Sequence, residues 1–232
     1  MIRIFDSEVL GAKNLNPSVR YLKLSVPEDF NFKPGQYVSL SVFRDGKKIR
    51  RPFSIASPKN SKNYIELCIK LIEGNKTSEF IKKLNKGDNV ELFGPIGNFI
   101  VNDLNKDLIF LSSGTGISAF ISMIPTILNT GFKNKIILLK AFRDESEILY
   151  EKEFSGLEIK HKNFKFYNVL SQPKNKNFEN KEHIQDFLKK YIPENFKGDF
   201  YICGLSDMIM SVKEKLISLG FPEEGIFYEK YD

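Results

Sequence analysis

The stretch Ser113-Gly114-Thr115-Gly116-Ile117-Ser118-Ala119 decides the fold of the second half of this chain. It ends the apolar run DLIFLSS (107–113), which is typical of a buried strand, and it opens ISAFISMIPTILN (117–129), which predicts a helix. Gly114, Gly116 and Ala119 fit the pattern Gly-x-Gly-x-x-Gly/Ala, in which glycines let the backbone approach an anionic ligand at a helix N-terminus. An ordinary tight strand–helix turn would use the same residues, so the pattern alone leaves both interpretations open.

Downstream of this turn, apolar runs typical of strands alternate with segments of helical period. The predicted strands are 135–142, 164–171, 198–204 and 225–231, and the predicted helices are 146–154, 181–191 and 205–220. The last helix is expected to bury one apolar face, made of Leu205, Met208, Ile209, Val212, Leu216 and Leu219. Strands that alternate with helices predict an α/β domain with a doubly wound parallel sheet.

In the first hundred residues, apolar and polar residues alternate in short runs that are separated by turn residues, as in short strands joined by turns. Strands are predicted in 18–26, 32–43, 63–72 and 86–97, with turns at Pro34-Gly35 and Asp45-Gly46. One short helix is predicted over 77–84, with Thr77 or Ser78 as its N-cap. Many short strands and one small helix indicate an antiparallel β-barrel. We therefore predict two domains, 1–102 and 103–232.

Composition excludes several classes of protein. Of the 232 residues 41% are hydrophobic, enough for a buried core, and the two cysteines are too few for a disulfide framework or a cysteine-held cluster. His161 and His183 have no partner at metal-ligand spacing, so no metal site is expected. The net charge of +6 comes from 29 Lys and only 6 Arg, and we interpret it as solvated surface rather than nucleic-acid binding.

The chain shows no sign of a membrane segment. No apolar run reaches the length of about 20 residues that a membrane span needs. The first residues lack the apolar centre and cleavage site of a signal peptide, so a cytoplasmic protein is expected.

The segment Arg51-Pro52-Phe53-Ser54-Ile55-Ala56-Ser57 offers a second candidate site. It combines an arginine that can clamp a phosphate with two nitrogens, an aromatic ring that can stack on a flat ligand, and a hydroxyl beside them. An ordinary barrel strand with a charged start is the alternative.

Taken together, these segments resemble the ferredoxin–NADP reductase superfamily, whose FAD- and NAD(P)-binding module is also found in flavin reductases. RPFS at 51–54 is similar to the flavin motif Arg-x-Tyr-Ser, with Phe53 where Tyr is usual. The resemblance implies that Arg51 holds the FAD pyrophosphate, that Pro52 and Phe53 line the flavin ring, and that Ser54 hydrogen-bonds its reactive nitrogen. It also implies further FAD contacts from Ile69, Lys76, Thr77 and Ser78.

The second half resembles the same family in three places. GTGISA is similar to its Gly-Thr-Gly-Ile-Ala-Pro segment, with Ser118-Ala119 in place of Ala-Pro, and this implies nicotinamide contacts from Gly114, Thr115 and Gly116. CG at 203–204 is similar to its Cys-Gly motif, which places Cys203 and Gly204 beside the nicotinamide; without the family, Cys203 reads as a small buried residue. Glu229-Lys230-Tyr231 resembles the family's C-terminal Glu-x-aromatic, although Asp232 follows here. The implied catalytic residues are Ser54, Cys203, Glu229 and Tyr231; a frayed terminus is the alternative for the last two.

The choice between NADP and NAD rests on few residues. Family members that prefer NADP often carry an arginine after the serine that ends the third strand of this domain, but here Ser171 is followed by Gln172. Arg143 could meet a 2′-phosphate instead, with help from Lys174 or Lys176. We therefore expect NADPH, and we expect Arg143, Ser171 and Gln172 to contact the nucleotide.

The resemblance implies hydride transfer between NAD(P)H and FAD, with electrons then passed to an acidic ferredoxin or flavodoxin. Three alternatives stay open: an NAD(P)H:flavin oxidoreductase that uses free flavin, an electron-transfer subunit of a larger complex, and a basic nucleic-acid binder without flavin.

Overall fold

The computed structural model describes residues 2–44 and 46–231. The chain forms two compact units: one comprises Met1–Ile100 with Ser118–Thr126, and the other Val101–Ile117 with Ile127–Asp232. The domain limits 1–102 and 103–232 stay a prediction, and each unit is described below by itself.

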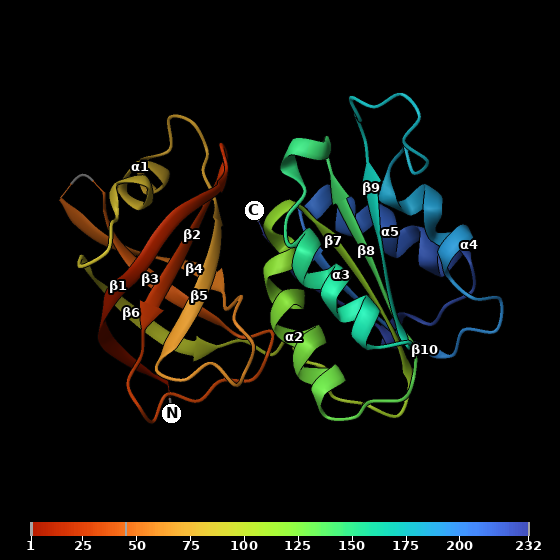
Figure 1. Cartoon of the computed structure of the whole chain (residues 1–232), viewed down its shortest axis with the longest axis horizontal. Coiled ribbons are helices and arrows are strands. Elements are labelled where there is room, and N and C mark those ends of the chain that lie inside the picture. The colour runs from red at the N-terminus through yellow and green to blue at the C-terminus, as the bar shows by residue number, and fades with distance from the viewer. Residues whose placement is uncertain (1, 45, 232) are drawn as a thin grey trace. The chain divides into compact units, whose positions relative to one another are not determined.

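The first unit is built on a six-stranded antiparallel sheet (Figure 1). Its strands are β1 (Arg3–Asn16), β2 (Val19–Ser25), β3 (Tyr37–Arg44), β4 (Lys47–Ser54), β5 (Tyr64–Lys70) and β6 (Asn89–Ile96), and its helix is α1 (Lys76–Lys83). The strand order is β4-β3-β6-β1-β2-β5, and a bridge between Ile55 and Leu67 links the end of β4 to β5. Because β4 and β5 are the two outer strands, this bridge curls the sheet, and the predicted antiparallel barrel is confirmed.

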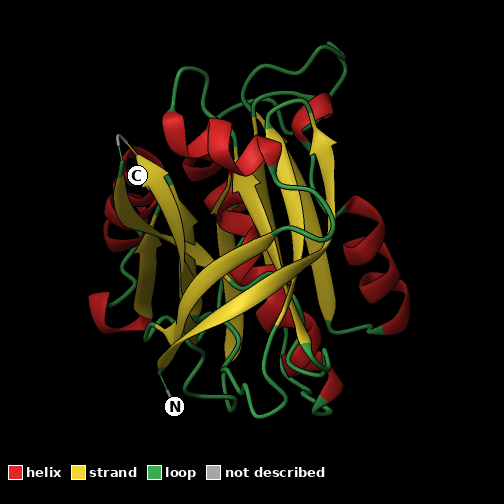
Figure 2. Ribbon diagram, turned by 90° about the vertical axis from the view of Figure 1, so that its left-hand side faces the viewer, coloured by secondary structure: helices red, strands yellow, loops and turns green. Residues whose placement is uncertain are grey.

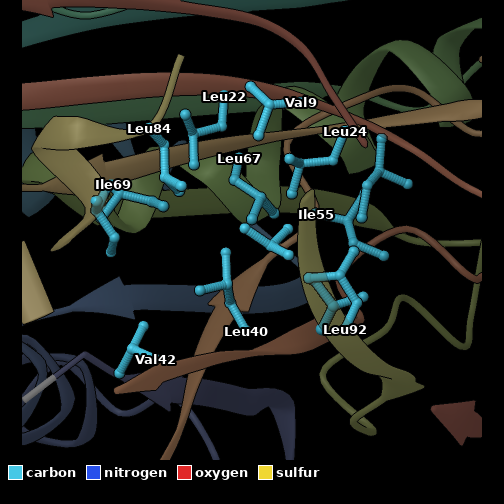
Figure 3. Close-up of a cluster of buried hydrophobic side chains, with 14 of the residues drawn as sticks. Val9, Leu22, Leu24, Leu40, Val42, Ile55, Leu67, Ile69, Leu84 and Leu92 are labelled. Carbon is cyan, nitrogen blue, oxygen red and sulfur yellow. The ribbon is translucent and has the colours of Figure 1, made fainter. Parts of the chain in front are cut away.

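The interior of this barrel is aliphatic (Figure 3). Side chains alternate between the two faces of a strand, so Val38, Leu40 and Val42 of β3 all point inward and are fully buried. They meet inward side chains of the other strands, including Leu22, Leu24, Leu67 and Leu92. The opposite face of these strands carries Ser39 and Ser41 of β3, with Pro52 and Arg50 of β4 beside them in the register.

The second unit contains a five-stranded parallel sheet in the order β11-β10-β7-β8-β9. Its strands are β7 (Asp107–Ser113), β8 (Ile136–Phe142), β9 (Phe164–Leu170), β10 (Gly198–Gly204) and β11 (Ile226–Lys230). The helices between them in the sequence are α2 (Ile117–Asn129), whose residues Ser118–Thr126 belong to the first unit, α3 (Glu151–Lys160), α4 (Leu188–Tyr191) and α5 (Ser206–Ser218). The 3-10 turns are η1 (Gly114–Gly116), η2 (Glu145–Glu147), η3 (Ile184–Phe187) and η4 (Glu223–Gly225). Figure 2 separates these strands and helices by colour, and the predicted α/β architecture is confirmed.

Helices cover both faces of this sheet. On one face, α5 contributes Ile209, Val212 and Leu216 to a cluster that also contains Ile184 and Leu188. On the other face, Phe154 of α3 packs against Phe164 and Phe166 of β9, with ring centroids 6.1 and 6.0 Å away. A sheet covered on both sides needs strands that are apolar throughout, which is how its sequence reads.

Several local predictions were wrong. The predicted helix 146–154 is instead the turn η2 followed by α3, because Tyr150 between them has φ 56° and so interrupts the helical backbone. The predicted helix 181–191 is the 3-10 turn η3 and the single helical turn α4. Leu205 does not join the buried face of α5: it precedes the helix and is 61% exposed.

Two further predictions concern the first unit. The N-cap of α1 is Asn75, not Thr77 or Ser78, because the Asn75 side chain accepts hydrogen bonds from the amides of both those residues. The long strand β1 was not predicted. The predicted turn at Asp45-Gly46 includes Asp45, which lies outside the described residues.

Membrane-spanning helices and metal-binding clusters are both absent from the described residues. None of the helices in 2–44 and 46–231 combines the length and the apolar character that a membrane crossing demands. The same residues contain no group of three or more His, Cys, Asp or Glu side chains arranged to hold a metal ion.

Candidate cofactor-binding sites

Arg51 and the start of α1 line one cavity in the first unit. The cavity has a volume of about 170 Å³, and its walls are Arg51, Gly74, Asn75, Lys76 and Thr77. Arg51 is exposed on β4, and within the described part of the chain no carboxylate forms an ion pair with it. A guanidinium group and a helix N-terminus facing one space form a favourable site for a phosphate anion.

The helix N-terminus at this cavity is already organised by its own side chains. Asn75 Oδ1 accepts from the amides of Thr77 at 2.9 Å and Ser78 at 3.2 Å. Ser78 is buried, and its hydroxyl accepts from the Ile72 amide at 2.9 Å, which fixes the turn that leads into the helix. Two of the predicted phosphate donors are therefore engaged in capping, and the positive charges at this cavity come from Arg51 and Lys76.

The other predicted flavin residues surround the end of β4. Pro52 is exposed, Phe53 is half-buried against the barrel core, and Ser54 is buried where β4 ends. Ile69 belongs to the hydrophobic core and is 2% exposed, so a contact from Ile69 to a ligand would have to use its backbone.

In the second unit, the glycine turn packs directly on the end of β10. Gly114, Thr115 and Gly116 form η1, and a β-carbon on Gly116 would overlap the carbonyl group of Cys203. Gly204, with φ +150°, leaves equally little room, because a β-carbon there would overlap the Ser113 hydroxyl. Both glycines are required by this close approach. The two motifs that the sequence singled out separately thus form one feature at the carboxyl edge of β7 and β10, where parallel sheets bind ligands.

The C-terminal residues are docked onto the same edge. The Tyr231 amide donates to the Gly204 carbonyl at 2.9 Å, and Glu229 lies opposite Cys203 in the pairing of β11 with β10. The Tyr231 side chain is half-buried, which argues against the interpretation of a frayed terminus.

Cys203 is fully buried and holds its proton. Burial and the nearby Glu229 carboxylate raise the pKa of the Cys203 thiol well above its ordinary value, and the interaction with Tyr231 only partly opposes them. A neutral thiol is a compact apolar group, so Cys203 can shape the edge of a binding site without acting as a nucleophile.

The loops that follow β8 and β9 lie against each other. Arg143 Nε donates to Gln172 Oε1 at 3.0 Å, and the Gln172 amide donates to the Arg143 carbonyl at 2.7 Å. The neighbouring Ser171 amide donates to the Phe142 carbonyl. The structure therefore brings together all three residues predicted to contact the nucleotide after β8 and β9.

Glu145 holds this loop pair from the β8 side. Its two carboxylate oxygens accept from the amides of Lys174 and Asn175, both at 2.9 Å, and these bonds lower the pKa of the Glu145 carboxyl. Lys174 also pairs with Asp144 at 3.3 Å. Sequence reasoning missed Glu145 and Asn75, since an exposed Glu or Asn in a loop carries no signal of its own.

The two units are those of an oxidoreductase that uses two nucleotide cofactors. Residues 6–100 match the oxidoreductase FAD-binding domain, and residues 110–214 match the oxidoreductase NAD-binding domain. The chain belongs to the ferredoxin–NADP reductase family of FAD- and NAD(P)-binding oxidoreductases.

The relatives are named for different electron-transfer systems. The chain is 33% identical over 225 residues to the reductase component of phenol 2-monooxygenase from Pseudomonas sp. (strain CF600), covering 94% of this chain but only 63% of that protein. It is 30% identical over 223 residues to NADH-cytochrome b5 reductase 1 of Dictyostelium discoideum, covering 92% of this chain and 77% of the relative. The crystal structure of a ferredoxin NADP+ reductase from Neisseria gonorrhoeae with bound FAD and NADP superposes with a TM-score of 0.87, at 22% identity and 98% coverage of both chains.

The residues present fit the two cofactors that these domains bind. The Arg51 cavity supplies a cationic, helix-capped cradle of the kind that a flavin pyrophosphate requires. The contact between Gly116 and Cys203 lies at the carboxyl edge of the parallel sheet, the edge at which such sheets bind nucleotides.

Proposed function

We propose that this chain accepts a hydride from NAD(P)H on a bound FAD and passes electrons singly to a separate ferredoxin or flavodoxin. The observation that carries this proposal is the Arg51 cavity, because an arginine with no ion-pair partner among the described residues faces a helix N-terminus there, and this combination favours a phosphate group. FAD, when bound, supplies the conversion of a two-electron donor into one-electron steps.

The side chains of the chain have binding and positioning roles in this proposal. Arg51 and Lys76 neutralise the FAD pyrophosphate, while Phe53 packs along the ring and the Ser54 hydroxyl orients it. In the second unit, the turn Gly114–Gly116 and the Cys203-Gly204 pair would contact the nicotinamide end of the nucleotide, and Cys203 would contribute a neutral thiol. Glu229 and Tyr231, docked beside Cys203, would complete this site and handle protons near it.

The proposed acceptor lies outside residues 1–232. The described residues offer no group of metal-binding side chains, and residues 1–232 have only two cysteines, so an iron–sulfur carrier would not be held by them. The net charge of +6 favours an acidic carrier through long-range attraction.

A second candidate is the reductase component of a multi-component oxygenase. The identity of 33% to the phenol 2-monooxygenase reductase component favours it, although this chain spans only 63% of that protein. In this case the acceptor would be a partner that holds its own redox centre.

NADPH is the proposed hydride donor. Arg143 forms no ion pair within the described residues, and only its Nε is engaged, by Gln172. Its terminal nitrogens can therefore meet a 2′-phosphate. Lys174, which the sequence also suggests, is less free because it pairs with Asp144.

The test is an absorbance spectrum of the purified protein, followed by anaerobic titration with NADPH and NADH and addition of acceptors. A yellow protein with one FAD per chain that reduces ferredoxin or flavodoxin supports the proposal. A colourless protein that reduces added riboflavin instead would identify a reductase of free flavin. A yellow protein that reduces only an oxygenase component would favour the second candidate.

A further inference from the structure

Lys140 is a fully buried lysine in the middle of β8. Its side chain has no exposed surface, and its Nζ donates to the Leu149 carbonyl at 3.2 Å and to Glu151 Oε2 at 2.9 Å. The ammonium also lies 5.1 Å from the Phe154 ring centroid and 4.7 Å from that of Phe166. Lysine is almost never fully buried unless it is paired, and the charge that pairs with it, on Glu151, is itself 47% exposed.

The two acceptors of Lys140 flank a strained residue. Tyr150 has φ 56°, in the left-handed region that side chains disfavour, and it connects the turn η2 to the first residue of α3. Such a conformation persists only where surrounding contacts impose it. Lys140 binds the carbonyl just before Tyr150 and the side chain just after it, so its ammonium fixes the backbone where the loop after β8 ends.

The same pair also reaches the loop after β9. Asn168 of β9 lies opposite Lys140 in the sheet register and donates to the same oxygen, Glu151 Oε2, at 2.9 Å. The Asn168 carbonyl accepts from Asn180 Nδ2 at 3.1 Å, and the Asn180 carbonyl accepts from the Leu170 amide. The Lys140–Glu151 pair is therefore a common anchor for the loop 143–150 and the loop 171–180, which carry Arg143 and Gln172.

We propose that Lys140 is a positioning residue for nucleotide binding, because its buried ammonium fixes the loops that present Arg143 and Gln172. This inference rests on the proposed function, in which those two residues contact NAD(P)H. Stability is a poor explanation for the buried charge: burial lowers the pKa of Lys140 despite Glu151, which means that the surroundings as a whole disfavour the ammonium.

The experiment compares Lys140→Met with the wild-type enzyme carrying its FAD. Methionine fills a similar volume between the Phe154 and Phe166 rings, so the melting temperature should not fall. The KM for NADPH should rise about tenfold and that for NADH less, with little change in kcat, because NADPH must then order the loop that carries Arg143 itself. An unchanged KM in a folded variant would overturn the proposal.

A second variant keeps the test decisive if Lys140→Met does not fold. Glu151→Gln retains an oxygen acceptor for Lys140 and Asn168 but removes the charge, so a smaller rise in KM of about threefold is expected. Glu153→Gln is the matched control, since Glu153 is exposed on the same helix and influences Lys140 only through space. Equal KM values for the wild-type enzyme, Glu151→Gln and Glu153→Gln would contradict the proposal.

A pH profile separates positioning by charge from simple packing. The charged groups that act on Lys140 are Glu151 and Glu153 of α3, while its sheet neighbours Ser112 and Asn168 are neutral. Burial lowers the pKa of Lys140, so the ammonium loses its proton at a pH below the ordinary lysine pKa of 10.5. As the pH is raised, the KM of the wild-type enzyme should therefore begin to rise before pH 10.5 is reached, whereas the KM of Lys140→Met should stay constant. Parallel profiles would overturn the role of the charge.

Failure of this inference can be told apart from failure of the proposed function. If Arg143→Ala raises KM and Lys140→Met does not, only the positioning role is wrong. If neither variant changes the KM for NADPH, the nucleotide does not bind at these loops. In that case the positioning role of Lys140 and the proposed nucleotide contact of Arg143 are both wrong.

Discussion

The backbone of Gly116 lies against the carbonyl group of Cys203 so closely that no side chain fits between them. This contact joins the turn after β7 to the end of β10, two segments that are 87 residues apart in the sequence (203 − 116). It explains why position 116 is a glycine, and the Ser113 hydroxyl restricts position 204 to glycine in the same way.

We expect Gly116→Ala to destabilise the second unit by several kcal/mol, because the new methyl group meets main-chain atoms that cannot rotate away (about 3 kcal/mol or more). Thermal unfolding of the variant measures this loss. Gly131→Ala is the matched control: Gly131 has φ +82° but open space around it, so only a backbone penalty of about 1–2 kcal/mol applies. Equal losses would mean that the contact with Cys203 is not tight.

Arg51→Ala should weaken FAD binding about 10- to 100-fold, the range expected when a charged hydrogen-bond donor to a phosphate is lost. Flavin retention after gel filtration, or a fluorescence titration of the apoprotein, gives the affinity. Arg50→Ala is the matched control, because Arg50 is the adjacent residue on β4 but points to the other face, over the Phe93 ring and near Glu91. If both variants retain FAD equally well, the Arg51 cavity is not the pyrophosphate site.

Asn75→Ala should cost about 1 kcal/mol of stability, the usual value of an N-cap that satisfies two helix amides. The exposed Asn60, in a turn, provides a control substitution that should change the melting temperature little. Because the freed amides of Thr77 and Ser78 then face the cavity, FAD affinity should change less than in Arg51→Ala. A loss of FAD as large as that of Arg51→Ala would show that Asn75 itself contacts the cofactor.

The two folds could be predicted from the sequence because apolar residues recur with a different period in each half of the chain. Apolar and polar residues alternate in the first half, and unbroken apolar strands lie between helices in the second. Both patterns belong to single segments, so they can be recognised without knowing the tertiary contacts. The predicted start of the helix was wrong where a contact from another segment affects the backbone conformation. Tyr150 has a left-handed conformation, and Lys140, ten residues earlier, binds the groups on either side of it.

The candidate sites were predictable where glycine, arginine or a family motif marks them. Arg51 and Gly116 carry such marks, and the structure places Arg51 at the cavity beside the start of α1 and Gly116 against the Cys203 carbonyl group. Asn75, Glu145 and Lys140 act through hydrogen bonds to groups whose positions depend on the fold. For Lys140, the one available signal was a charge inside the apolar run IILLKAF.

Native protein should resist thiol reagents at pH 8, because Cys203 and Cys68 are both buried and the pKa of Cys203 is raised above its ordinary value of 9.0. In Cys68→Ala, a chromogenic disulfide should react with the remaining thiol only on unfolding. The sign for stability follows: folded Cys203 keeps a proton that the unfolded chain releases, so its contribution is intact below pH 9.0 and is lost at higher pH. Rapid labelling of the native variant would contradict the burial of Cys203.

Arg143→Ala should raise the KM for NADPH about tenfold or more and that for NADH much less, because only NADPH has a 2′-phosphate to lose its partner. Steady-state kinetics with both nucleotides on the FAD-loaded enzyme gives the comparison. Lys133→Ala is a suitable control, since Lys133 is an exposed cation just before β8, at the opposite edge of the sheet from Arg143. Equal rises for the two nucleotides would place Arg143 at a part common to both. A rise for Lys133→Ala as well would mean that overall charge, and not a local contact, attracts the nucleotide.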